Sequence, residues 1–150
     1  MGLFTPIAGF GVTLRQMFRK RVTNRYPKEM RPKPQRFHGR HVLNRYPDGM
    51  EKCIGCELCA GVCPARCIYV RGKDNPKDEP VSPGERVGFI YEINLLLCIF
   101  CALCVEACPT EDITMTNLFE MSVSNRDDAI YTRSELLMEA DGTVPNPQPV

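Results

Sequence analysis

The strongest constraint on this chain is a pattern of cysteines that occurs twice. Each occurrence has the spacing C-x2-C-x2-C-x3-C-P, and each cysteine of the second lies 45 residues after its counterpart in the first. The first group is Cys53, Cys56, Cys59 and Cys63 before Pro64, and the second is Cys98, Cys101, Cys104 and Cys108 before Pro109. A period of this regularity indicates two copies of one structural unit. The ninth cysteine, Cys67, falls outside the pattern, because its counterpart is Asp112.

This spacing is typical of proteins that bind two iron–sulfur cubes. Three thiolates two residues apart wrap a loop around one corner of a cluster, and the fourth, followed by proline, ligates the other cluster. The pattern therefore predicts two [4Fe-4S] clusters with crossed ligand sets. The first cluster is predicted to use Cys53, Cys56, Cys59 and Cys108, and the second Cys98, Cys101, Cys104 and Cys63. Such a protein carries electrons, and no residue is predicted to be catalytic.

Disulfides and zinc are the alternative uses of so many cysteines, and both fit the pattern poorly. Disulfides need an oxidising compartment, and we expect no export signal, because the basic residues follow the first apolar stretch rather than precede it. Zinc sites use four ligands, usually as two separated pairs. We expect Cys67 to be a small buried hydrophobe rather than a ligand. His38 and His41 are not expected to be metal ligands, because the clusters already have complete sets.

The charge distribution divides the chain into a basic arm and an acidic body. Residues 1–50 contain 11 Lys and Arg against 2 Asp and Glu, whereas residues 51–150 contain 8 against 16. This asymmetry favours docking to a charged partner or surface. No apolar run approaches the ~18 residues that a membrane-spanning helix needs, so integral insertion is not expected.

Four segments are predicted along the chain. Residues 1–22 are predicted to form an amphipathic helix at a membrane interface, with ordinary packing on a neighbouring helix as the alternative. Its apolar stripe comprises Ile7, Phe10, Leu14, Met17 and Phe18. Residues 23–50 are predicted to be an extended basic arm, 51–120 the two-cluster domain with a polar insertion at 71–88, and 121–150 a C-terminal extension and tail.

Each repeat is predicted to contain a cluster loop, a short helix and a small strand, and one more short helix is predicted downstream. The strands are expected at 67–71, 87–92 and 113–116, and Thr132 with Glu135 forms a capping box before a short helix. The predicted fold class is α+β, a ferredoxin-like two-[4Fe-4S] domain with the N-terminal helix, the basic arm and the C-terminal extension.

Several stretches outside the cysteine groups resemble one known family. They are Arg36-Phe-His-Gly-Arg-His-Val-Leu-Asn-Arg45, Gly84-Glu-Arg86, Tyr91-Glu-Ile-Asn94 and Cys98-Ile-Phe-Cys101. The chain resembles, to about residue 140, the subunit of NADH–quinone oxidoreductase (respiratory complex I, subunit I) that carries two tetranuclear clusters. The resemblance implies a ferredoxin-like domain that relays electrons towards the terminal cluster and quinone in the peripheral arm, without a substrate-converting site of its own.

The resemblance also implies partners and a location. The partners would be a large iron–sulfur subunit upstream, the terminal-cluster subunit downstream and the membrane subunit at the quinone site, with peripheral membrane contact and no nucleic acid. The location would be the cytoplasmic face of a bacterial inner membrane, or the matrix side in an organelle. The chain departs from the family pattern at Leu97, where arginine is typical, at Ala102, where glycine is common, and at Cys67 and Asp112, where alanine is usual.

Three other functions compete with this one. The first is the equivalent subunit of a related membrane-bound hydrogenase or formate-oxidising complex, which shares the cysteine pattern. The second is a diffusible ferredoxin, which needs no basic arm or N-terminal helix. The third is a zinc-containing nucleic-acid adaptor, suggested only by the interleaved basic and aromatic residues of the arm.

Overall fold

The computed structural model describes residues 5–139 and 141–144, and the chain divides into two units, Met1–Lys33 and Pro34–Val150. The first unit contains helix α1, Thr5–Met17. Phe10, Leu14 and Met17 are exposed on it, while the side chain of Ile7 lies outside the described residues. Within the described residues, no helix combines the length and apolar composition needed to cross a lipid bilayer.

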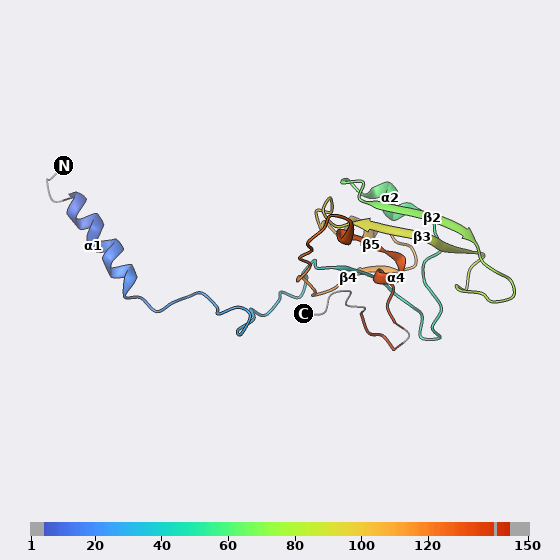
Figure 1. The fold of residues 1–150 in the computed structure, drawn as a ribbon, viewed down its shortest axis with the longest axis horizontal. Coiled ribbons are helices and arrows are strands. Elements are labelled where there is room, and N and C mark those ends of the chain that lie inside the picture. The colour runs from blue at the N-terminus through green and yellow to red at the C-terminus, as the bar shows by residue number, and fades with distance from the viewer. Residues whose placement is uncertain (1–4, 140, 145–150) are drawn as a thin grey trace. The chain divides into compact units, whose positions relative to one another are not determined.

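The second unit is built around a three-stranded antiparallel sheet. Its strands are β2 (Ile68–Asp74), β3 (Arg86–Asn94) and β5 (Ile130–Thr132), in the order β2-β3-β5. The β2–β3 hairpin is the long feature of this unit (Figure 1), paired from Ile68 opposite Ile93 to Asp74 opposite Arg86. Residues along the start of β2 alternate between buried and exposed, which is the pattern of a sheet with one face on the core.

A second, two-stranded sheet joins distant parts of the chain. Strand β1 (His41–Leu43) pairs antiparallel with β4 (Ile113–Met115), so that His41 lies opposite Met115 and Leu43 opposite Ile113. Two short helices follow the cysteine loops, α2 (Leu58–Val62) and α3 (Leu103–Glu106). The buried apolar core lies between these elements and comprises Leu43, Ile68, Val70, Tyr91, Ile93, Ile113, Tyr131 and Leu136, together with Cys59, Cys67 and Cys104.

The C-terminal extension is packed into this unit. It contains a 3-10 turn, η1 (Asp127–Ala129), then β5 and helix α4 (Arg133–Leu136). The capping box is confirmed, because both the backbone N–H and the hydroxyl of Thr132 donate to Glu135 Oε2 at 2.7 Å. Arg133 Nε donates to the buried Glu51 carboxylate at 3.1 Å, which ties α4 to the chain just before the first cysteine group.

The structure differs from the predicted division at the arm and at the insertion. Residues 39–43 are buried rather than extended into solvent, and the Arg40 guanidinium lies 5.4 Å from the centre of the Tyr131 ring. These residues are buried because β1 pairs with the distant strand β4. Proline content and charge do not predict such a pairing. The predicted insertion at 71–88 overlaps strands at both ends, since β2 continues to Asp74 and β3 begins at Arg86, and residues 75–85 between them form neither helix nor strand.

Candidate metal centres

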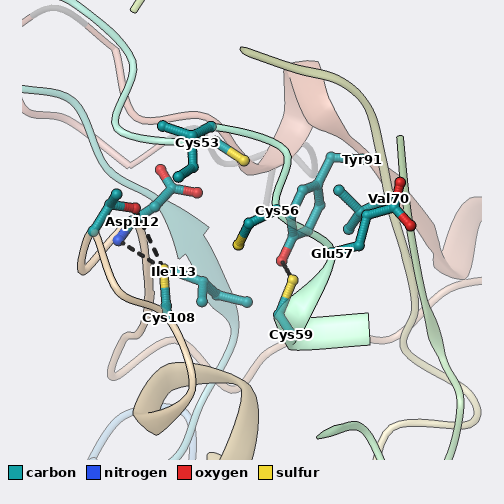
Figure 2. Close-up of a pocket in the computed structure, with 11 residues that line it drawn as sticks. Cys53, Cys56, Glu57, Cys59, Val70, Tyr91, Cys108, Asp112 and Ile113 are labelled. Carbon is teal, nitrogen blue, oxygen red and sulfur yellow. Dashed lines mark hydrogen bonds between the residues drawn. The ribbon is translucent and has the colours of Figure 1, made fainter. Parts of the chain in front are cut away.

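Four cysteines of the predicted first set line one cavity. Cys53, Cys56, Cys59 and Cys108 surround a space of about 310 Å³ that is partly open to solvent, and Figure 2 shows their sulfurs directed into it. Three of them come from the first cysteine group and Cys108 comes from the second. This cavity therefore brings together cysteines from both groups.

The predicted second set lines another cavity, of about 290 Å³. Cys98, Cys101 and Cys104 come from the second group and Cys63 from the first. Cys67 lines this cavity too, which the sequence did not predict. It is buried, as expected, but its sulfur lies 3.4 Å from that of Cys63.

The 45-residue repeat is visible in the backbone of the two loops. Left-handed φ angles recur at matched positions: Gly55 (62°) and Phe100 (52°), Glu57 (64°) and Ala102 (66°), Arg66 (49°) and Glu111 (52°). Five of these six residues are not glycine, and non-glycine residues rarely adopt this conformation. Such strain persists where the surrounding structure fixes it, and here it bends both loops around their cavities in the same way.

The bent loops direct backbone N–H groups at the sulfurs. The N–H of Phe100 donates to Cys98 Sγ, and that of Asp112 donates to Cys108 Sγ, each at 3.3 Å. Hydrogen bonds to cluster sulfurs are one of the means by which a protein sets the reduction potential of a cluster. The same backbone conformation therefore brings the thiols together and surrounds them with donors.

Two buried polar side chains distinguish the first cavity. The Tyr91 hydroxyl donates to Cys59 Sγ at 3.3 Å (Figure 2), and burial raises the pKa of Tyr91 well above its usual range, so it remains a donor. Asp112 is 2% exposed, and its Oδ1 has no hydrogen-bond partner among the described residues. Burial raises the pKa of Asp112 to about 7. The cysteine spacing predicted neither of these two side chains at the cavity.

At the second cavity, the buried polar side chain is an imidazole. His41 lines it, is 1% exposed and stacks on the Phe100 ring with centroids 5.7 Å apart. Burial lowers the pKa of His41 to about 4, so the ring is neutral at ordinary pH. The neighbouring His38 is exposed and is not among the lining residues, and its Nδ1 lies 3.0 Å from the Phe100 carbonyl oxygen.

The buried thiols of both sets need a bound cation in order to ionise. Burial raises the pKa of Cys53 and of Cys104 to about 12, and it is also the largest influence raising the pKa of Cys59 and Cys98. Metal ligation needs thiolates, and a bound cationic metal supplies the compensating charge that these buried sulfurs lack. Among the described residues, no group of three or more His, Cys, Asp or Glu side chains is placed to hold a single metal ion.

Comparisons with known proteins agree with this geometry. Residues 52–112 match the family model of the 4Fe-4S dicluster domain. The chain is also similar to a solved chain of the membrane-bound sulfane sulfur reductase, an archaeal respiratory membrane complex, with 27% identity and a TM-score of 0.54. That match covers 85% of this chain and 58% of the other, so this chain spans little more than half the length of its relative. Residues 52–112 are thus a ferredoxin-like dicluster domain, and the protein binds two [4Fe-4S] clusters.

Proposed function

We propose that this protein is the two-cluster electron-transfer subunit of a membrane-bound NADH–quinone oxidoreductase. It relays electrons through its two [4Fe-4S] clusters towards the terminal cluster and quinone, in contact with the large iron–sulfur subunit, the terminal-cluster subunit and the quinone-site membrane subunit. It sits peripherally on the cytoplasmic face of the membrane. The family resemblance of the arm and of Tyr91–Asn94 supports this choice of complex.

The observation that carries the proposal is the pair of cavities with exchanged fourth cysteines. We assign Cys53, Cys56, Cys59 and Cys108 to the first cluster and Cys98, Cys101, Cys104 and Cys63 to the second, as the cavity linings support. Cys59 and Cys104 belong to one buried core, and the helices that carry them, α2 and α3, contact each other. That arrangement suits transfer of electrons from one cluster to the other through protein.

The chain's own residues indicate a path for this transfer. When bound, each cluster accepts and releases one electron at a time. Within each set one cysteine is exposed, Cys56 in the first and Cys101 in the second, while Cys59 and Cys104 are buried. The exposed cysteines are the points at which electrons enter and leave, and the buried pair lies on the internal path. The apolar core around that pair excludes water and so limits the reorganisation that accompanies each transfer.

A second candidate is the equivalent subunit of a respiratory membrane complex with another substrate. The observation in its favour is the similarity to a chain of the archaeal sulfane sulfur reductase, at 27% identity. The cysteine pattern and the cavities are equally compatible with both complexes. The two candidates differ in the proteins that surround the subunit rather than in the subunit itself.

Purification of the tagged full-length chain from its native membrane distinguishes the candidates. We expect about eight irons per chain, and co-purification of subunits that oxidise NADH with a quinone as acceptor. Co-purification of a sulfur-reducing or hydrogen-oxidising assembly would favour the second candidate. Recovery of the chain alone from intact membranes would argue against both.

A further inference from the structure

The second cavity contains more thiols than one cluster can use. Five cysteines line it, Cys63, Cys67, Cys98, Cys101 and Cys104, whereas a [4Fe-4S] cluster takes four. The fifth, Cys67, is 6% exposed, and its sulfur lies 3.4 Å from that of Cys63. Cys98, which lines the same cavity, is close enough to interact electrostatically with Cys67. Cys67 is thus among the predicted ligands rather than behind them.

The chain between Cys63 and Cys67 explains why both sulfurs face one space. The Arg66 N–H donates to the Cys63 carbonyl at 3.2 Å, and Arg66 itself has a φ of 49°, so the backbone turns sharply between the two cysteines. Strand β2 begins immediately afterwards and fixes the direction of the chain. Cys67 therefore reaches the cavity without any rearrangement of the sheet.

The second half of the repeat offers an internal comparison. Position 112 is the counterpart of 67, and it carries a carboxylate instead of a thiol. Asp112 lines the first cavity just as Cys67 lines the second. The two halves thus have the same backbone bends and the same spacing of four cysteines. They differ in that a fifth thiol, Cys67, lies beside Cys63, whereas a carboxylate, Asp112, lies beside Cys108.

We propose that Cys67 is a reserve ligand of the second cluster, which binds its fourth iron when Cys63 is lost or chemically blocked. The proposal rests on the ligand sets proposed above. The exchange involves no oxidation or reduction: Cys67 releases one proton as its thiolate binds iron, and a displaced, intact Cys63 takes up one proton. The first cluster has no such reserve, since no second thiol lies beside Cys108 in the described lining of its cavity.

The test compares three variants of the full-length chain, purified within its complex: C63A, C63A/C67A and C108A. The readouts are iron content and the electron paramagnetic resonance signal of each reduced cluster. We expect C63A to keep about eight irons and to show a second-cluster signal that is altered but present. The double variant should lose the second signal and about half of its iron. C108A should lose the first signal, because its half of the repeat lacks a spare thiol.

Each outcome decides the matter. If C63A loses the second-cluster signal, the reserve role is overturned, whether or not the first-cluster signal is lost as well. The first-cluster signal reports whether the domain is folded. An unchanged second signal in C63A would also overturn it, since Cys67 would then be the ordinary ligand. A wild-type chain without two four-iron signals would instead contradict the proposed function, so the two failures are distinguishable.

Discussion

Tyr91 and His41 show how single buried side chains make two repeated sites unequal. The thiol spacing is the same at both, but a hydroxyl donates to a cysteine of the first set while a neutral imidazole lies beside the second cavity. Hydrogen bonding and local polarity set cluster potentials as much as the ligands themselves. Differences between the two clusters are therefore expected to trace to residues outside the cysteine pattern.

Replacing Tyr91 by phenylalanine removes the hydroxyl and keeps the aromatic ring. A donated hydrogen bond stabilises the more negative, reduced cluster, so Y91F should lower the potential of the first cluster. A difference of about 1 kcal/mol between the two redox states corresponds to roughly 40 mV for one electron. Redox titration monitored by paramagnetic resonance measures it, and the second cluster serves as the internal control. A potential that falls equally for both clusters would contradict the assignment of Tyr91 to the first.

His41 gives the fold a dependence on pH. Its pKa is about 4 in the fold and about 6.5 in an unfolded chain, so the unfolded chain binds more protons between these values. Its contribution to stability is complete above about pH 6.5 and decreases as the pH falls towards 4, by about 1.4 kcal/mol between pH 7.5 and 5.5. H41F keeps a ring against Phe100 and cannot titrate. Urea-induced bleaching of the clusters should lose part of its pH dependence in H41F, and an unaltered dependence would exclude His41 as its source.

At the scale of elements, strand β3 forms a wall of the first site. A Cβ built on Gly88 would lie 2.6 Å from Cys53 Sγ, so this strand can approach the cysteine loop only because position 88 lacks a side chain. The N–H of Gly88 also donates to the Cys53 carbonyl at 3.2 Å. The hairpin therefore does more than cover the core, since it determines where one of the thiols stands.

Substituting this glycine should damage the first cluster selectively. G88A displaces either Cys53 or the strand, and iron content should fall from about eight to about four with loss of the first-cluster signal. The matched control is G84A, where the nearest atom to a new Cβ is Ile54 Cγ2 at 3.6 Å, an ordinary contact. Iron analysis and paramagnetic resonance of both variants provide the measurement. Retention of both signals in G88A would mean that β3 does not position Cys53.

Elements were predictable from the sequence where the signal is local. The expected strands at 87–92 and 113–116 correspond to β3 and β4, and the capping box at Thr132 starts α4 as predicted. The partner of each strand was not predictable, because β1 pairs with β4 across some 70 residues. For the same reason the cysteines could be identified from their spacing, whereas Tyr91, Asp112 and His41 could not. Their approach to the cavities depends on how separate strands pack, and no short motif encodes that.

At the scale of the whole molecule, the basic residues divide between two settings. Those before residue 34 belong to the first unit, whereas Arg40 and Arg45 lie within the second and contact its interior. Arg45 Nε donates to the Met138 carbonyl at 2.8 Å, for example. Only some of the basic residues in 1–50 are thus available for docking, and these are concentrated before residue 34.

Deletion of residues 1–22 tests what the first unit does. These residues contain no cysteine, so the shortened chain should retain about eight irons and both cluster signals. It should fail to stay with the membrane complex, because burial of each large apolar side chain of the helix is worth roughly 1.5–3 kcal/mol of docking energy. Membrane fractionation and NADH-dependent quinone reduction measure the effect. Loss of the clusters would show instead that residues 1–22 support the dicluster domain.

The exchange of the fourth cysteine between the two cavities also constrains how the protein is made. Neither proposed site has its full set of thiols until Cys104 and Cys108 have been synthesised and have left the ribosome, although Cys53 emerges about fifty residues earlier. Delivery of iron and sulfide is therefore confined to a late stage, after both halves are available. A nascent or truncated chain that ends between Cys63 and Cys98 holds reduced thiols but no complete site. Maturation of either cluster consequently has to wait until the second cysteine group has been made.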